Sequence, residues 1–137
     1  MSDLKTIGER LRNQDNRITQ NPMFCVQKLV RDVGYDQAYC GNVCWRDSAN
    51  DITTYDDDEN FVEPEGDEWE SFGYVDRWET VMVAFTEAGC EDYLKLDGHN
   101  IRRQAHNGQV RIYVESFNRC QEMISIREAL MKPGNMQ

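Results

Sequence analysis

Several features that would assign this chain to a class of protein are missing from its sequence. No apolar run approaches the roughly eighteen residues of a membrane-spanning helix. The first residues, Met-Ser-Asp-Leu-Lys, lack the apolar core of a signal peptide. We therefore expect a cytoplasmic protein that does not enter a membrane and whose five cysteines stay reduced, and their odd number agrees with this.

Motifs that mark common catalytic sites are missing as well. The sequence contains no phosphate-binding loop, nucleophile elbow or H-E-x-x-H helix, so we expect no cofactor and no catalytic residues. The alternative left open is a small hydrolase or ligand-binding enzyme that uses His99, Asn100 and Arg111. One pocket holding all three side chains would favour that enzyme, whereas scattered, outward-facing side chains would count against it.

Zinc ligands are few and poorly spaced. The candidates are two cysteines and two histidines, namely Cys40, Cys44, His99 and His106. A lone C-x3-C pair is a weak signal, and free cysteines are usually buried thiols, so we expect no zinc site.

A calcium site is equally poorly supported. Asp56, Asp58 and Asn60 match three positions of an EF-hand loop. However, Phe61 stands where glycine is required, and Asp67 stands where the bidentate glutamate should be. We therefore expect no metal at this loop.

Basic residues are missing from one long stretch, residues 47–76. This acidic insert has twelve acids and no Lys or Arg, whereas the other 107 residues have 13 acids and 15 bases. The negative net charge therefore comes from the insert alone, set into a nearly neutral chain. Its acids are Asp47, Asp51, Asp56, Asp57, Asp58, Glu59, Glu63, Glu65, Asp67, Glu68, Glu70 and Asp76.

The acidic insert also contains aromatic residues, which purely solvating acidic tracts tend to lack. They are Tyr55, Phe61, Trp69, Phe72 and Tyr74. This composition favours docking on a partner; the alternative is a solvated loop that keeps the chain soluble. A pI of about 4.6 disfavours direct binding to nucleic acid or to anionic membranes and favours a basic protein surface.

Mimicry of nucleic acid would place a demand on the insert. Duplex DNA carries one charge per about 1.7 Å of its axis. Thirty extended residues span at most roughly 100 Å, which spaces twelve charges by about 8 Å. A mimic therefore requires the insert to fold, whereas a loose acidic clamp does not.

The candidate partner-binding residues all lie in this insert. We expect carboxylates to supply attraction and two aromatic residues, Phe61 and Trp69, to act as anchors. The carboxylates are those of Asp56, Asp57, Asp58, Glu59, Glu65, Asp67 and Glu68. Arg102, Arg103 and Arg111 are expected to neutralise the acidic insert within the fold; the alternative is that they bind an anion or another chain.

The hydrophobic pattern predicts one α+β domain spanning residues 1–137. Residues 1–21 are expected to form a short helix and a polar linker, and a strand is expected at 43–45. The pattern of residues 23–31 suits either a helix that begins at Asn21-Pro22 or a buried strand. Residues 56–60 are expected to be a loop, because a run of acids repels itself and disfavours strands. The continuous apolar run within 77–85 predicts a covered strand.

The C-terminal half is expected to contain two helices and a hairpin. Thr86 should cap a helix that ends at Gly98. Asn107-Gly108 predicts a tight hairpin that joins strands 101–105 and 110–116. A last helix should run from about 118 to 131, with Asn118 as its cap. The sum is an antiparallel or mixed sheet with two C-terminal helices packed on it.

A set of residues spread in order over about 22–130 also resembles a known pattern. They are Gly34-Tyr35-Asp36, Tyr39, Trp45, Gly73-Tyr74, Trp78-Glu79, Phe85-Thr86-Glu87-Ala88-Gly89, Asp92-Tyr93, Gly98-His99-Asn100, Arg111-x-Tyr113-Val114, Ser116 and Arg119. The pattern is similar to a family of small uncharacterised proteins encoded by tailed bacteriophages and prophages. The resemblance implies a strand at 23–31 and a viral context, and it implies no mechanism. Relatives carry Asn-Glu-Trp where this chain has Cys120-Gln121-Glu122.

Viral context and charge together suggest a function. Small acidic phage proteins often bind and block a host protein, and targets that handle nucleic acid have basic grooves. We expect an accessory protein of the anti-defence or host-takeover kind, anti-CRISPR-like, that acts in the bacterial cytoplasm without contacting nucleic acid itself. A self-associating assembly component, such as a homodimer, is a further option.

Overall fold

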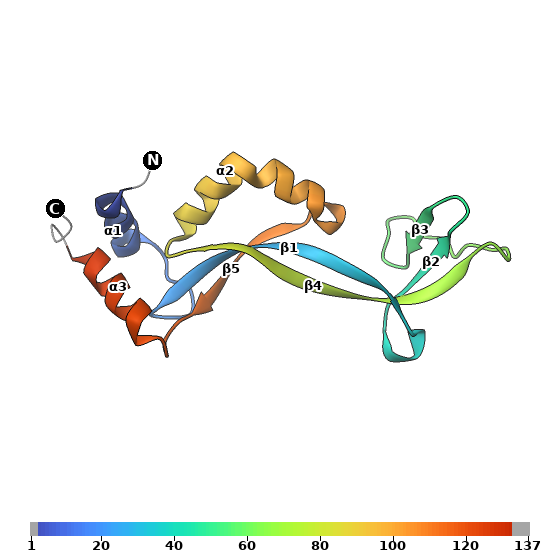
Figure 1. Cartoon of the computed structure of the whole chain (residues 1–137), viewed down its shortest axis with the longest axis horizontal. Coiled ribbons are helices and arrows are strands. Elements are labelled where there is room, and N and C mark those ends of the chain that lie inside the picture. Colours follow the sequence, from blue (N-terminus) through green and yellow to red (C-terminus); the bar gives the residue numbers. More distant parts are fainter. Residues whose placement is uncertain (1–2, 133–137) are drawn as a thin grey trace. The chain divides into compact units, whose positions relative to one another are not determined.

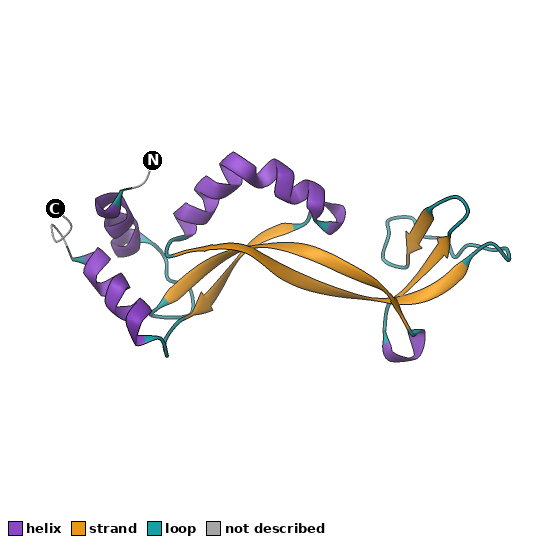
Figure 2. Ribbon diagram, in the orientation of Figure 1, coloured by secondary structure: helices purple, strands orange, loops and turns teal. Residues whose placement is uncertain are grey.

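The computed structural model describes residues 3–132 and shows a single α+β domain, as the sequence predicts (Figures 1 and 2). Its five strands form one antiparallel sheet in the order β3-β2-β4-β1-β5. The elements are α1 (Leu4–Asn13), β1 (Pro22–Tyr35), β2 (Val43–Asp47), β3 (Ile52–Tyr55), β4 (Glu70–Ala84), α2 (Glu87–Gln104), β5 (Val110–Ser116) and α3 (Gln121–Met131). Short 3-10 turns occupy Gln37–Tyr39 and His106–Gly108.

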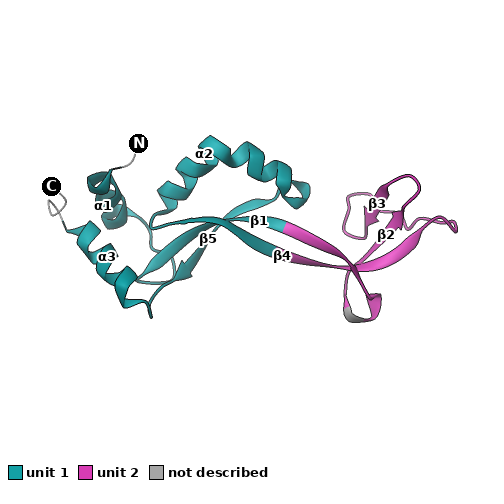
Figure 3. Ribbon diagram, in the orientation of Figure 1, with its two compact units in different colours: residues 1–29, 78–137 teal, residues 30–77 magenta. Residues whose placement is uncertain are grey.

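Contacts within the chain divide it into two compact units (Figure 3). Unit 1 comprises residues 1–29 and 78–137, and unit 2 comprises residues 30–77. Strands β1 and β4 contribute residues to both. Unit 2 contains 14 acids and 3 bases, whereas unit 1 contains 11 acids and 12 bases. The excess of negative charge therefore belongs to unit 2.

The hydrophobic core of unit 1 lies between α2 and one face of the sheet. Phe24, Val26 and Cys90 are buried at its centre. Alternate residues of β5 pack against them, as the period-2 pattern predicts. The surrounding side chains are Met82, Ala84, Tyr93, Leu94, Val110, Ile112 and Val114. Each fully buried apolar side chain of this kind contributes about 1.5–3 kcal/mol.

Helix α2 begins as predicted and ends later than predicted. The Thr86 hydroxyl accepts a hydrogen bond from the Gly89 N–H at 2.9 Å, which confirms the cap. Gly98 is buried inside the helix, so the predicted end there is wrong. Ile101 and Ala105 are four residues apart and both buried, so they continue the apolar stripe of α2 instead of forming a strand.

The predicted hairpin at Asn107-Gly108 is also wrong. Both residues do adopt positive φ, 53° and 68°, as an Asn-Gly turn requires. The turn joins α2 to β5, because the residues before it belong to the helix. An Asn-Gly pair marks a left-handed turn and does not specify what the turn connects.

Helices α1 and α3 pack together, and the start of α3 differs from the prediction. Cys120 occupies the cap position without a side-chain hydrogen bond, so the predicted cap at Asn118 is wrong. The Asn118 carboxamide instead accepts a hydrogen bond from Asn21 Nδ2 at 2.8 Å. Gly8 lies against the Leu130 carbonyl, where a Cβ would collide, and this close approach brings α1 onto α3.

Candidate interaction surface

The acidic insert is folded in the structure. Strand β3, which the sequence did not reveal, pairs antiparallel with β2, and β2 pairs antiparallel with the start of β4. Cys44 on β2 therefore lies between Tyr55 and Phe72 in the ladder. Residues 56–69 connect β3 to β4 without a helix or strand, and the loop predicted at 56–60 is therefore confirmed. The folding that mimicry requires is thus present.

Unit 2 is organised around one buried arginine, Arg31. Its side chain is only 3 % exposed, yet it lies among groups that satisfy its charge. It donates two hydrogen bonds to Asp57, at 2.9 and 2.8 Å, and two to Asp76, at 2.7 and 2.9 Å. Its guanidinium lies 4.1 Å from the ring centre of Tyr74 and 4.7 Å from that of Tyr55. The N–H groups of the guanidinium thus bond to the two carboxylates, while the group also makes cation–π contacts with the two tyrosine rings.

The ionisation of this cluster reflects the pairing. Burial alone would lower the pKa of Arg31, but the hydrogen bonds to Asp76 and Asp57 outweigh burial and raise it above its ordinary value. The hydrogen bonds from Arg31 hold the pKa of Asp57 below its ordinary value. Burial, together with the hydrogen bond to Asp56, raises the pKa of Tyr74. Arg31 and Asp57 are therefore both charged and paired at neutral pH, whereas the Tyr74 hydroxyl is neutral.

Three further acids of the insert accept hydrogen bonds from backbone N–H groups of unit 2. Asp56 accepts hydrogen bonds from the Val43 N–H at 2.9 Å and from the Tyr74 hydroxyl at 2.5 Å. Asp58 accepts from the Tyr55 N–H at 2.9 Å. Asp47 is buried and accepts from the N–H groups that follow it in the turn. These carboxylates hold turns in place, so they are not free to attract a partner.

The remaining acids define a candidate interaction surface, named here the acidic surface. Its members are exposed and form no ion pair with any residue in the described range 3–132. They are Glu59, Glu63, Glu65, Asp67, Glu68 and Glu70. All lie in the connection between β3 and β4 or at its end, so their charges gather on one part of unit 2.

Apolar groups accompany the acidic surface. Phe61 is half-buried because its ring stacks on Trp45 at 5.2 Å, so it serves packing within unit 2. Trp69 is half-buried and retains an accessible face. Val62, which the sequence did not single out, is 78 % exposed. An apolar side chain with that exposure amid acids is available to a partner.

The structure sorts the residues proposed from the sequence into two groups. Glu59, Glu65, Asp67 and Glu68 point outward without ionic partners in residues 3–132, whereas the three aspartates at 56–58 have intramolecular roles. Glu63 and Glu70 belong with the outward group and were missed. Charge counting finds the segment, but only hydrogen bonding shows which carboxylates are occupied.

The expected neutralisation by Arg102, Arg103 and Arg111 is not what the structure shows. Arg31 and Arg46 form the ion pairs of the insert among the described residues. Arg111 instead donates to Gln27 Oε1 at 2.8 Å and lies over the rings of Trp78 and Tyr113, at 4.2 and 4.4 Å. Nothing in the sequence around 23–31 marked Arg31 as the partner.

The residues of the alternative enzyme site are not brought together. His99 and Asn100 are exposed on α2, where Asn100 donates to Asp97 at 2.8 Å. Arg111 alternates with Ile112 on β5 and therefore lies on the sheet face opposite the one covered by α2. This arrangement gives the enzyme hypothesis no support.

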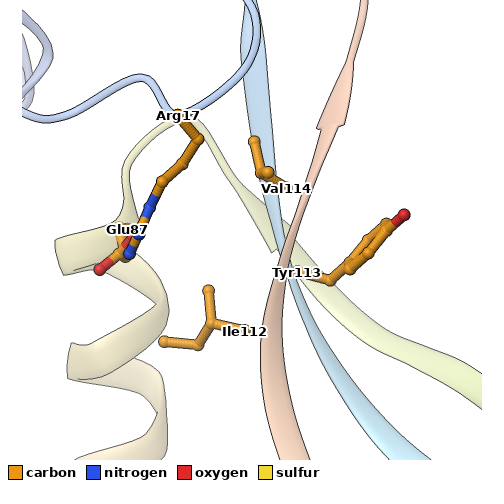
Figure 4. Close-up of a pocket in the computed structure, with 5 residues that line it drawn as sticks. All are labelled: Arg17, Glu87, Ile112, Tyr113 and Val114. Carbon is orange, nitrogen blue, oxygen red and sulfur yellow. The ribbon is translucent and has the colours of Figure 1, made fainter.

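Among residues 3–132, no group of three or more His, Cys, Asp or Glu side chains is placed to hold a metal ion. Cys44 is fully buried, and burial raises the pKa of its thiol. Two cavities, of about 270 and 370 Å³, lie along β5 in unit 1. Figure 4 shows the smaller, between the Arg17–Glu87 ion pair and Ile112 and Val114.

Comparisons with known proteins give no match: no family model, no curated protein and no solved structure matches this chain. Within the described range, no helix is long and apolar enough to cross a membrane. Functional inference therefore depends on the residues and on their geometry.

Proposed function

We propose that this protein is a non-enzymatic accessory protein, encoded by a bacteriophage, that binds a basic surface of a nucleic-acid-handling host protein and blocks it. The observation that carries the proposal is the acidic surface: six exposed carboxylates without ionic partners in residues 3–132, on a unit with 14 acids and 3 bases. Unit 1 is nearly neutral, so the attraction for a basic groove resides in unit 2. The site of action in this proposal is the cytoplasm of the infected bacterium.

A cluster of exposed charges of one sign mainly affects the rate at which two proteins associate. Exposed charges of one sign speed the association with a surface of the opposite sign, and salt screens the effect. The three arginines of unit 2 already have partners: Arg31 pairs with Asp57 and Asp76, Arg46 with Asp51, and Arg77 with Asp32. They therefore do not neutralise the carboxylates of the acidic surface. Val62 and Trp69 supply apolar area that salt does not screen.

The test neutralises exposed carboxylates that form no ion pair within residues 3–132. A variant with Glu59→Gln, Glu65→Gln, Asp67→Asn and Glu68→Gln removes four charges while leaving the Arg31 cluster intact. The matched control removes four exposed acids of unit 1: Glu9→Gln, Glu91→Gln, Glu122→Gln and Glu128→Gln. Replacing Asp56, Asp57 and Asp58 would be a poorer test, because those carboxylates hold unit 2 together.

The readout is capture of host proteins from a bacterial lysate at low and high salt, then a titration of the purified captured protein. We expect the unit 2 variant to bind about 30-fold more weakly, since four surface ion pairs of about 0.5 kcal/mol each are lost. Its affinity should also vary less with salt than that of the control. Equal affinity and equal salt dependence in the two variants would refute the proposal.

A further inference from the structure

Strand β5 is an edge strand of the sheet, and its outer side is open. The Leu29 N–H donates to the Gln109 carbonyl at 3.0 Å, and the Phe117 N–H donates to the Asn21 carbonyl at 3.1 Å. In an antiparallel pair, hydrogen-bonded and non-hydrogen-bonded positions alternate. With the register between β1 and β5, the odd-numbered residues of β5 therefore bond to β1.

The even-numbered residues of β5 point their N–H and C=O groups away from β1. They are Val110, Ile112, Val114 and Ser116. No backbone or side-chain group in residues 3–132 bonds to these outward N–H groups. An unpaired row of this kind is a template for another strand.

Strand β3, at the other end of the strand order, differs from β5 in its outward backbone groups. Strand β3 is only four residues long, and Asp58 closes it. The Tyr55 N–H donates to the Asp58 carboxylate at 2.9 Å, and the Tyr55 carbonyl accepts from the Asp58 N–H at 3.1 Å. Both backbone groups of Tyr55, which face away from β2 in this register, are thus satisfied. The outward backbone groups at the end of β3 are therefore satisfied within the chain, whereas the outward N–H groups of β5 form no such bonds within residues 3–132.

The side chains along β5 are complementary in charge to those of a second, antiparallel copy of the same strand. We propose that β5 of a second copy of this chain pairs antiparallel with this edge, about a two-fold axis at Tyr113. In that register Arg111 lies opposite Glu115 of the second copy, and Glu115 lies opposite its Arg111. On the other face of the strand, Ile112 lies opposite Val114 in both directions.

Charge complementarity selects this register over its neighbours. A two-fold axis at Ile112 or Val114 would place Tyr113 opposite Arg111 or Glu115 and would form no ion pair. Arg111 donates to Gln27 through Nε, and its guanidinium also lies over the rings of Trp78 and Tyr113. Its terminal nitrogens donate no hydrogen bond to residues 3–132, so they retain donors for a carboxylate. Opposite charges directly across two strands are stabilising, and like charges are destabilising.

The surroundings of β5 suit a second strand. Figure 4 shows Ile112 and Val114 projecting toward the Arg17–Glu87 pair, and Tyr113 projecting to the other side. Tyr113 is 43 % exposed. Because unit 1 has 11 acids and 12 bases, its local charge does not oppose self-association. A contact of one strand is small, so the dimer should dissociate in the micromolar range or above.

The test is sedimentation of the full chain over a concentration series. We expect a reversible dimer, weakened about tenfold by Glu115→Arg, which places two arginines opposite each other. The control Glu91→Arg makes the same charge change on an exposed part of α2 and should leave the dimer unchanged. Adding Arg111→Glu to Glu115→Arg should restore association, because the pair is then reversed.

Hydrogen exchange gives a second readout at the backbone. As concentration rises, the N–H groups of Ile112 and Val114 should become protected, whereas those of Arg111 and Tyr113 are protected already by β1. A chain that stays monomeric throughout would overturn the proposal. So would a dimer that Glu115→Arg and Glu91→Arg affect equally.

Discussion

Replacing Arg31 by methionine should destabilise unit 2 far more than any other single loss of positive charge there. Methionine keeps an apolar stem between the rings of Tyr55 and Tyr74 but removes the guanidinium. Four hydrogen bonds of 2.7–2.9 Å to Asp57 and Asp76 disappear together. Among the residues of unit 2 whose burial is described, the buried apolar side chains are those of Cys44 and Tyr74, so little other apolar burial stabilises this unit.

The size of the effect follows from the exposure of the two carboxylates. Removing one partner of a buried ion pair costs about 3–5 kcal/mol when the other charge stays buried. The Asp57 and Asp76 side chains are 53 % and 33 % exposed, so water can partly solvate them once the arginine is gone. We therefore expect a loss of about 2–4 kcal/mol in the free energy of unfolding of unit 2.

The matched control is Arg46→Met, in the same unit. Arg46 meets Asp51 at 3.5 Å, and both side chains are well exposed, so its loss should cost below about 0.5 kcal/mol. Urea unfolding combined with hydrogen exchange of peptides from residues 43–74 measures both variants. If Arg31→Met cost no more than Arg46→Met, the central role assigned to the Arg31 cluster would be wrong.

Two further predictions concern pH and thiol chemistry. The folded-state pKa of Asp57 is lowered by the hydrogen bond from Arg31, so its contribution is complete above the unfolded-state value of about 3.9 and is lost as the pH falls through the folded-state value. Unit 2 should therefore lose stability in acid, and Arg31→Met should flatten that dependence in a pH series of urea titrations. Burial raises the pKa of Cys25 and Cys90 to about 11, whereas Cys120 is exposed. Mass spectrometry after iodoacetamide treatment at pH 8 should find Cys120 alkylated before either buried thiol, and simultaneous alkylation would contradict the packing.

The sequence predicted those elements whose signals are local and unambiguous. The alternation at 110–116 and the Thr86 cap each act over a few residues, and each is found where expected. The apolar run at 81–85 does form the end of a strand, but the prediction that both of its faces are covered is wrong, because Val83 is half exposed. The end of α2 was mispredicted because a glycine usually stops a helix. The burial of Ile101 and Ala105 outweighs that preference here.

The candidate surface was predictable as a region and not residue by residue. Twelve acids without a base are visible in the sequence, but their division into structural and free carboxylates depends on partners far away in the chain. Arg31 is 26 residues from Asp57 and 45 from Asp76. The edge of β5 was invisible for the same reason, since strand order is set by tertiary pairing.

The chain enters and leaves unit 2 through neighbouring antiparallel strands, β1 and β4. Gln27 and Thr80 bond across these strands at 3.1 Å, just inside the boundary of unit 1. Residues 30–77 are therefore joined to unit 1 by two neighbouring strands of the sheet. Substitutions in the acidic surface should therefore leave the core around Phe24 and Cys90 folded as before.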